Sequence, residues 1–285
     1  MQMVAFVKAK KMQRNRFIVF CISLLAVVLF CPGCDADLLG LFGSPDFEER
    51  LNEKGTFHFL TPADRSLTLG DTYSFIVLTD THIEGSDAHG LEKLKDVING
   101  ASFVVITGDI TNRGDREEVQ KFIAIARSLG VPCYPVLGNH DVYFGNWGVW
   151  KDMIGSSSYR IDTPLSSTTL FIMDSGNAAW GARQIDWLDN ELKSAKPRRF
   201  IFTHANLFVE SPGDIEQFTD VRERSRIMSM LKGRCDAMFT GHVHKRIIRN
   251  AGGVEYITLE DYRSNKTYCR VFVSPAGLRY EFAKL

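Results

Sequence analysis

The sequence predicts an α/β fold, and three observations support this prediction. Short continuous runs of β-branched and aromatic residues recur along the chain, as is typical of strands buried on both faces of a sheet. Between these runs lie stretches with apolar residues three and four positions apart, which is the spacing of helices that pack on a sheet. Polar clusters rich in Asp and His follow the runs directly. This order predicts a sheet covered by helices, with a functional site where the strands end.

Strand and helix signals alternate from residue 73 onward. Continuous apolar runs predict six strands, at residues 75–78, 103–106, 134–137, 169–173, 200–202 and 237–239. Amphipathic stretches predict four helices, at residues 91–98, 117–129, 184–192 and 221–231.

The pattern changes after residue 244, where the helical stretches stop. Four further strands are expected, at residues 247–248, 254–259, 268–273 and 278–282. Gly252-Gly253 is a typical hairpin turn between the first two. These strands predict a second, more antiparallel sheet that closes the domain. The sequence has no internal repeat of about 20–50 residues, which excludes solenoids and propellers, so one domain is expected at residues 71–285.

The first 33 residues have the pattern of a secretory signal peptide. Five basic residues precede an uncharged run at residues 17–30. This run is short for a permanent membrane-spanning helix, which needs about 20 residues. It ends in Cys31-Pro32-Gly33-Cys34, which resembles a bacterial lipobox, although Cys31 stands where leucine is usual. We expect residues 1–33 to be removed and Cys34 to be lipidated; an unlipidated signal and an uncleaved anchor are the alternatives. Residues 34–70, a mixture of Gly, Pro and charges, are expected to be a tether.

The charge of the chain is unevenly distributed. Residues 1–33 hold five of the 34 basic residues and none of the 34 acidic ones, so the remainder has 29 basic against 34 acidic residues and a net charge of −5. This balance disfavours a nucleic-acid partner, because phosphate backbones are bound by basic surfaces. The three cysteines beyond Cys34 are widely spaced and predict neither a disulfide framework nor a cysteine metal site.

Five polar clusters follow predicted strands. They are Asp80-Thr81-His82, Gly108-Asp109-Ile110-Thr111-Asn112, Gly138-Asn139-His140-Asp141, Thr203-His204 and Gly241-His242-Val243-His244. Each cluster alone is a weak signal, since a single histidine at a strand end is more often a core or capping residue. Together they gather carboxylates, an amide and imidazoles. This mixture without thiolates favours a metal such as Mn, Fe, Zn, Co or Ni over calcium.

The side-chain types suggest individual roles. Residues two apart on an extended chain point to the same side, so Asp80 and His82 could hold one cation. The carboxylate of Asp109 has two oxygens and could bridge two cations, and the amide oxygen of Asn139 is a neutral ligand. A histidine followed by an aspartate suits an oriented acid. We therefore expect His140 to transfer protons and Asp141 to fix its ring.

The order D-x-H, G-D-x-x-N, G-N-H-D, a single H and G-H-x-H resembles the signature of calcineurin-like metallophosphoesterases, over about residues 73–260. This resemblance implies a four-layer α/β/β/α sandwich of two mixed sheets, with the active site at the carboxyl ends of the strands. It also implies two divalent metal ions. The first would be bound by Asp80, His82, Asp109 and His244, and the second by Asp109, Asn139, His204 and His242.

The resemblance also implies the reaction. Two cations would acidify a bridging water, and the hydroxide would attack phosphorus in line while His140 protonates the leaving oxygen. Residues 108–141 and Gln184-Ile185-Asp186-Trp187-Leu188 resemble the small cyclic-nucleotide phosphodiesterase-like branch. Protein Ser/Thr phosphatases, an alternative, carry a glutamate after G-N-H and D-R-G in the second motif. This chain has Asp141 and Asn112-Arg113-Gly114 there.

We expect an enzyme that hydrolyses phosphate mono- or diesters in the cell envelope, attached to the membrane by a lipid or free outside the cytoplasm. Its substrate would be a small phosphorylated molecule such as a nucleotide, a phospholipid or a glycolipid phosphate. The rival from another class is a metal-binding surface lipoprotein without activity, and the presence of both His140 and Asp141 argues against it. Arg113 could reach a substrate phosphate, or be a solvated loop residue. The aromatic residues Tyr143, Phe144, Trp147 and Trp150 could stack on a base, contact a lipid headgroup or pack in the core.

Overall fold

The computed structural model describes residues 47–164, 167–208, 218 and 220–285. Its strands form two sheets. The five-stranded sheet has the order β11-β10-β1-β2-β3 and consists of β1 (Tyr73–Leu78), β2 (Ala101–Ile106), β3 (Cys133–Pro135), β10 (Thr267–Ser274) and β11 (Gly277–Lys284). The six-stranded sheet has the order β4-β5-β6-β7-β9-β8 and consists of β4 (Tyr159–Asp162), β5 (Thr168–Ile172), β6 (Arg198–Phe202), β7 (Ala237–Thr240), β8 (Ile247–Ala251) and β9 (Val254–Thr258).

Both sheets are mixed, as expected. In the first, β1, β2 and β3 are parallel and β10 runs antiparallel beside β1. In the second, β5, β6, β7 and β9 are parallel, and β4 and β8 are antiparallel edge strands. Every residue of β1 is buried, which explains its continuous apolar sequence.

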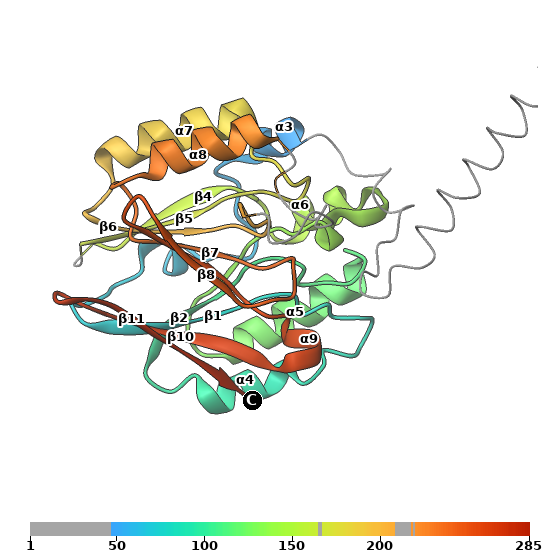
Figure 1. Ribbon diagram of the computed structural model, residues 1–285. Coiled ribbons are helices and arrows are strands. Elements are labelled where there is room, and N and C mark those ends of the chain that lie inside the picture. Colours follow the sequence, from blue (N-terminus) through green and yellow to red (C-terminus); the bar gives the residue numbers. More distant parts are fainter. Residues whose placement is uncertain (1–46, 165–166, 209–217, 219) are drawn as a thin grey trace, which may run out of the picture. The chain divides into compact units, whose positions relative to one another are not determined.

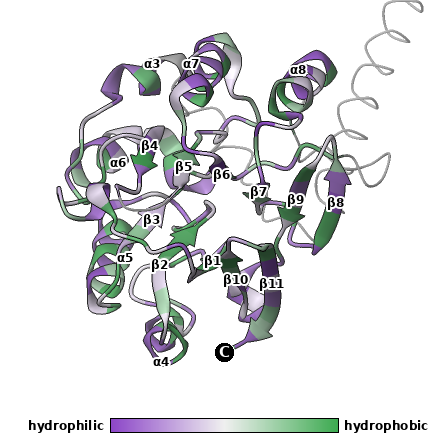
Figure 2. Ribbon diagram, turned by 90° about the vertical axis from the view of Figure 1, so that its left-hand side faces the viewer, coloured by the Kyte–Doolittle hydropathy of each residue, from purple (hydrophilic) through white to green (hydrophobic). Residues whose placement is uncertain are grey.

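Helices cover the outer face of each sheet and complete four layers (Figure 1). The helices on the six-stranded sheet are α7 (Gly181–Ser194) and α8 (Val221–Leu231), and those on the five-stranded sheet are α4 (Leu94–Val97) and α5 (Arg116–Ser128). In Figure 2, the helices combine hydrophilic and hydrophobic faces, as helices packed on a sheet do. The predicted α/β/β/α sandwich is therefore confirmed.

An aromatic core fills the space between the two sheets. The ring of Phe75 on β1 stacks on that of Phe103 on β2 with a centroid distance of 4.6 Å. It also meets Phe200 and Phe239 of the six-stranded sheet at 5.4 and 5.9 Å. All four residues are completely buried. This packing fixes one sheet against the other and therefore fixes the loops that leave them.

The C-terminal strands are arranged differently from the prediction. β9 lies between β7 and β8 and runs parallel to β7, whereas β10 and β11 extend the five-stranded sheet. The prediction that these four strands form a second, more antiparallel sheet is therefore wrong. A strand pattern indicates which faces are buried but not which strand is the partner. The hairpin at Gly252-Gly253 is confirmed: both glycines have positive φ, 62° and 79°, and Ala251 pairs with Val254.

Short helices fill several connections. The expected helix at residues 91–98 is split into η3 (Leu91–Lys93) and α4. The other short elements, absent from the sequence prediction, are η4 (His140–Gly145), α6 (Trp147–Met153) and α9 (Tyr262–Asn265).

The described residues from 47 to 70 belong to the folded domain, although the sequence predicted a tether at 34–70. This segment forms α3 (Phe47–Arg50), η1 (Leu51–Glu53) and η2 (Asp64–Ser66). It buries Phe59 and Leu67 in the core, and the completely buried guanidinium of Arg50 forms a double ion pair with Asp174 at 2.7 and 2.9 Å. The prediction failed because the few apolar residues of this polar segment follow no periodic pattern.

The predicted signal peptide at residues 1–33 and the predicted lipidation site Cys34 lie outside the described residues. Within the described part of the chain, the helices are too short or too polar to cross a lipid bilayer.

Candidate metal centre

The predicted site residues lie on five loops, and each loop follows a parallel strand. The loops after β1, β2 and β3 carry Asp80, His82, Asp109, Asn139 and His140, and the loops after β6 and β7 carry His204, His242 and His244. The structure brings all of these side chains together, and they come from both sheets. The polar clusters at the strand ends therefore lie close enough to form groups that could hold a metal ion.

Glycines in the motifs let the loops approach one another. A Cβ atom at Gly241 would overlap Thr79 Oγ1 and Asp80 Oδ2, and a Cβ atom at Gly138 would overlap the backbone and carboxylate of Asp109. Each glycine therefore lies against the ligand-bearing loop of a different motif. Any larger residue would separate the loops and disperse the site.

Five of the seven predicted metal ligands have a left-handed backbone, which residues other than glycine rarely adopt. Their φ values are 52° for Asp80, 43° for His82, 47° for Asp109, 71° for His242 and 52° for His244. Asp80 and His82 therefore meet because of two left-handed residues beyond the end of β1, and not because of strand alternation as the sequence analysis assumed. Strain of about 1–3 kcal/mol per residue is typical of functional sites.

Three candidate ligand atoms surround Nε2 of His204, which is itself a fourth. Its Nε2 lies 3.2 Å from Asp109 Oδ2, 3.1 Å from Asn139 Oδ1 and 3.0 Å from His242 Nδ1. A first-row cation bound at about 2.0–2.2 Å from each ligand leaves neighbouring ligand atoms about 3 Å apart. This spacing fits the predicted second metal.

Hydrogen bonds orient two of these ligands. A carbonyl oxygen can only accept, so His204 Nδ1 donates to Thr107 O at 2.9 Å and leaves Nε2 directed at the site. Asn139 Nδ2 donates to Tyr143 Oη at 2.8 Å, which leaves the amide oxygen for a cation. This role of Tyr143 was not predicted from the sequence, although Tyr143 lies only four residues after Asn139 in the same motif loop.

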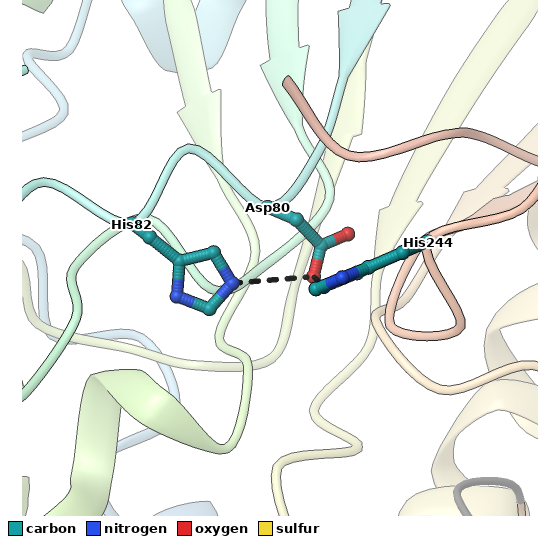
Figure 3. A group of neighbouring side chains, drawn as sticks. All are labelled: Asp80, His82 and His244. Atoms are coloured by element: carbon teal, nitrogen blue, oxygen red, sulfur yellow. Dashed lines mark ion pairs between the residues drawn. The ribbon is translucent and has the colours of Figure 1, made fainter. Parts of the chain in front are cut away.

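The first group of ligands is drawn in Figure 3, where His82 and His244 approach the Asp80 carboxylate from two different loops. Asp80 Oδ1 lies 3.2 Å from His244 Nε2 and 3.8 Å from His82 Nε2. Asp80 Oδ2 is already engaged, since Thr79 Oγ1 and the backbone amide of His242 donate to it at 2.7 and 3.0 Å. The carboxylate is thus fixed with Oδ1 facing the two imidazoles.

Buried polar atoms without partners show that these residues fit a cation. Among the described residues, Asp80 Oδ1 and both ring nitrogens of His82 are buried and form no hydrogen bond of acceptable geometry. Leaving such atoms unsatisfied is costly. A divalent cation between Asp80 Oδ1 and His82 Nε2 would satisfy one atom of each residue, and carboxylate and imidazole are ligands that first-row metals accept.

Asp109 connects the two groups through one oxygen. Its Oδ2 lies 3.2 Å from His204 Nε2 and 3.8 Å from His82 Nε2. Its Oδ1 accepts a hydrogen bond from the backbone amide of His140 at 2.9 Å. From the side-chain type alone, both oxygens could have formed the bridge. In the structure Oδ2 alone faces both groups, and Oδ1 holds the next motif loop in place.

The charges of the site favour a cation. Burial alone would raise the pKa of Asp80, but the close approach of His244 and the charge of His204 hold this pKa at about 2. Burial would likewise raise the pKa of Asp109, but His204 and His140 hold it well below its usual value. Both carboxylates are therefore ionised in a buried site, where negative charge attracts metal ions strongly.

The imidazoles divide into two classes. Burial lowers the pKa of His82 to about 4, and burial reinforced by His204 lowers the pKa of His242 to about 3, so both rings are neutral ligands at neutral pH. Burial opposes protonation of His204 and His244 as well, but Asp109 raises the pKa of His204 to about 9 and Asp80 raises that of His244 to about 9. In these two the proton occupies the place that a metal ion would take.

His140 lies beside the first group. Its ring centroid is 4.6 Å from that of His82, and one of its ring nitrogens is within 4.8 Å of ligand atoms of His82 and Asp109. Its Nδ1 donates to the backbone carbonyl of Asn112 at 2.8 Å, which fixes the ring.

Asp141 does not have the predicted contact with His140. Its buried carboxylate accepts from the backbone amides of Thr111 and Gly138, both at 2.9 Å, and from Thr111 Oγ1 at 2.7 Å. The role assigned to Asp141, fixing the His140 ring, is therefore wrong and belongs to the Asn112 carbonyl. Adjacent residues in a tight 3-10 turn direct their side chains apart, and Asp141 instead ties the second motif loop to the third.

The sequence matches the family model of calcineurin-like phosphoesterases over residues 73–246. The fold is similar to that of a dimetal phosphatase from Danio rerio, with a TM-score of 0.57, 13% identity and coverage of 74% of this chain and 98% of that chain. It is similar to purple acid phosphatase PPD1 from yellow lupin (Lupinus luteus), with a TM-score of 0.61, 13% identity and coverage of 76% and 52%. It is also similar to GAP50, the anchor in the inner membrane complex of Plasmodium, with a TM-score of 0.58, 13% identity and coverage of 75% and 84%. Comparison with curated proteins gives no match.

The matched segment covers more than half of the chain and contains every loop that carries a candidate ligand, from Asp80 to His244. The structural neighbours share its fold. The chain therefore belongs to the calcineurin-like phosphoesterase family and is a metal-dependent phosphoesterase.

Proposed function

We propose that this protein uses two divalent cations to hydrolyse small phosphate mono- or diesters in the cell envelope. The observation that carries the proposal is the position of Asp109 Oδ2, which faces two groups of ligand atoms at once. A protein that needed one structural ion would not require both groups. His140, a residue able to donate a proton, lies directly beside them.

The geometry is compatible with the ligand sets that the family resemblance implies. Asp80, His82 and His244 would hold one cation, Asn139, His204 and His242 the other, and Asp109 both. When bound, the two cations supply Lewis acidity at the phosphoryl oxygens and make water a better nucleophile at neutral pH. The chain holds the ligand atoms in place before the reaction, through the hydrogen bonds that Asp80 Oδ2 accepts and the one that His204 Nδ1 donates.

His140 is proposed to act on the leaving group. The hydrogen bond from Nδ1 to Asn112 O holds the ring in one orientation and leaves its other nitrogen available. An imidazole in this position can donate a proton to the departing alkoxide. Tyr143 packs against the ring with a centroid distance of 4.3 Å and restricts its rotation.

The subclass is a finer part of the proposal. Asp141 after G-N-H and the absence of D-R-G favour a small-molecule esterase similar to the cyclic-nucleotide phosphodiesterase-like branch over a protein Ser/Thr phosphatase. The net charge of −5 beyond residue 33 disfavours a nucleic-acid substrate. Nucleotides, phospholipids and glycolipid phosphates remain as substrate types.

The location is proposed from the N-terminal sequence. Five basic residues, the apolar run at residues 17–30 and the lipobox-like Cys34 favour export and attachment to the membrane by a lipid. Mass spectrometry of the mature protein from cell envelopes would test this. Cleavage before Cys34 with a lipid-sized mass increase is expected, and an intact N-terminus would contradict it.

The rival function is metal binding without turnover. One finding favours it, since GAP50, with a similar fold, is described as an anchor. The placement of His140, which holds no cation in the proposed ligand sets but lies beside them, favours a catalytic centre instead.

The test uses the full chain with p-nitrophenyl phosphate and bis(p-nitrophenyl) phosphate, after metal removal and again after reloading with Mn²⁺ or Zn²⁺. Turnover should depend on the metal, and the faster ester identifies a mono- or diesterase. His242→Ala should lose one of the two ions and most turnover, whereas His140→Ala should keep both ions and lose turnover. A protein that binds two ions but hydrolyses neither ester would refute the proposal in favour of the rival function.

A further inference from the structure

Phe144 combines two unfavourable features. It is 37% exposed, and among the large hydrophobic residues that are exposed in the described part of the chain it is the only aromatic one. Its backbone is left-handed, with φ 56° and ψ 24°, a conformation that bulky residues seldom adopt. Residues held in such a conformation cluster at functional sites.

Arg113 covers one face of this ring. Its Cζ atom lies 4.4 Å from the ring centroid of Phe144, in the geometry of a cation–π contact. Their loops are packed together, since Asn146 Nδ2 donates to Arg113 O at 3.0 Å and a Cβ atom at Gly114 would overlap the carbonyl of Asp141. The Arg113–Phe144 pair is therefore held by two motif loops of the metal centre.

The pair lies beside His140. The residue before Arg113, Asn112, accepts the hydrogen bond from His140 Nδ1 at 2.8 Å. The residue before Phe144, Tyr143, has its ring centroid 4.3 Å from that of His140 and 6.1 Å from that of Phe144. Each member of the pair thus directly follows, in the sequence, a residue that contacts His140, the proposed proton donor to the leaving group. If His140 protonates the leaving group as proposed, the leaving group of a bound ester would lie next to the Arg113–Phe144 pair.

We propose that the Arg113–Phe144 pair binds a planar aromatic group carried by the leaving group of the substrate, such as a nucleobase. This inference rests on the proposed function and narrows its substrate class from three types to nucleotides. A base can stack on the partly exposed Phe144 ring, and the guanidinium adds positive charge that attracts electron-rich rings. Acyl chains and sugars have no π face and gain less from this pair.

The test compares AMP with ribose 5-phosphate. Both esters have the same type of leaving oxygen and differ in the adenine base, so the ratio of their kcat/KM values isolates recognition of the base. Stacking of one base on an aromatic side chain corresponds to a factor of about 5 to 150. We expect the metal-loaded full chain to prefer AMP by a factor in this range.

Two variants remove the pair. Phe144→Asn deletes the ring but keeps a residue type that tolerates the left-handed backbone, and Arg113→Gln removes the guanidinium. Each is expected to bring the ratio towards 1. Arg279→Gln is the matched control, because Arg279 stacks on Phe272 at 4.1 Å in the same way. Phe272 pairs with Ser74 near the start of β1, at the opposite end of the strand from the metal centre, so the ratio should not change.

The outcomes separate the inference from the proposed function. Equal kcat/KM values for the two esters in the wild-type protein would overturn the inference and leave the proposed function intact. A preference for AMP that survives in both variants would have the same meaning. Faster turnover of phosphatidic acid in vesicles than of AMP would overturn it as well. If the two-metal protein hydrolyses neither AMP nor ribose 5-phosphate, the dissociation constants of the two compounds are measured by calorimetry instead. The ratio of these constants then tests the inference in the same way as the ratio of kcat/KM values.

Discussion

Replacing Arg50 with methionine is expected to destabilise the protein by about 3–5 kcal/mol. The Arg50 and Asp174 side chains are 0% and 1% exposed, and two charge-assisted hydrogen bonds of 2.7 and 2.9 Å join them. Methionine keeps an apolar stem of similar length but removes the charge that compensates the carboxylate. Two unit charges about 4 Å apart attract each other by about 4 kcal/mol at an effective dielectric constant of about 20, which lies within the expected range.

Thermal unfolding of the metal-free protein, followed by circular dichroism, measures this loss. In a domain of this size each kcal/mol lowers Tm by about 2–4 °C, so Arg50→Met should lower it by about 6–20 °C. The matched control is the ion pair of Arg226 with Asp186, whose side chains are 51% and 63% exposed. Arg226→Met should change the stability by less than about 1 kcal/mol.

A Tm of Arg50→Met within about 2 °C of the wild-type value would refute the reasoning. It would mean that the segment at residues 47–70 docks without help from this ion pair. A second variant separates charge from packing. Because apolar residues often replace a buried ion pair at little cost, Arg50→Met combined with Asp174→Leu should be more stable than Arg50→Met alone.

Three further predictions concern the metal centre. Gly241→Ala should abolish binding of both ions, measured by plasma mass spectrometry, because the added Cβ overlaps Thr79 and Asp80. Retention of both ions would show that the loops can separate without loss of metal binding. Tyr143→Phe should lower the affinity for the second ion about 10- to 100-fold in chelator competition, because the Asn139 amide loses its hydrogen-bond partner. The control Tyr159→Phe, which removes a phenol hydrogen bond to Pro135 O, should leave this affinity unchanged. Each ion, supplied at about 100 times its Kd, should raise the stability by about 2.7 kcal/mol and Tm by about 5–10 °C, and an unchanged Tm in a differential scan would contradict tight binding.

The positions of the candidate ligands could be derived from the sequence because the signals are local. Asp109 follows a continuous apolar run, and strand ends in an α/β sheet are where ligands gather. His204 follows β6 in the same way. The backbone conformation that brings these side chains together could not be predicted from the sequence. Asp80 and His82 meet through two left-handed residues, and no residue type in this motif signals a positive φ as glycine would.

The remaining features depend on contacts between distant parts of the chain. Arg50 and Asp174 are 124 residues apart in the sequence, so the composition of residues 34–70 predicted a tether and gave no sign of this ion pair. Asp141 appeared to serve its neighbour His140, but its partners Thr111 and Gly138 come from the packing of two loops. β9 could be predicted as a strand but not as the parallel partner of β7, because pairing is a property of the assembled sheet.

The candidate ligands come from loops of both sheets, so the ribosome synthesises them at different times. Asp80 and His242 are 162 residues apart, yet they share a hydrogen bond and belong to the same site. A growing chain that has released only its first three motifs presents a carboxylate-rich half-site without His204, His242 and His244. Full affinity for metal arises only after β7 has been synthesised and has packed on β9 and β6. We therefore expect metal uptake to follow chain completion, and the metals available where folding ends to compete for the finished site.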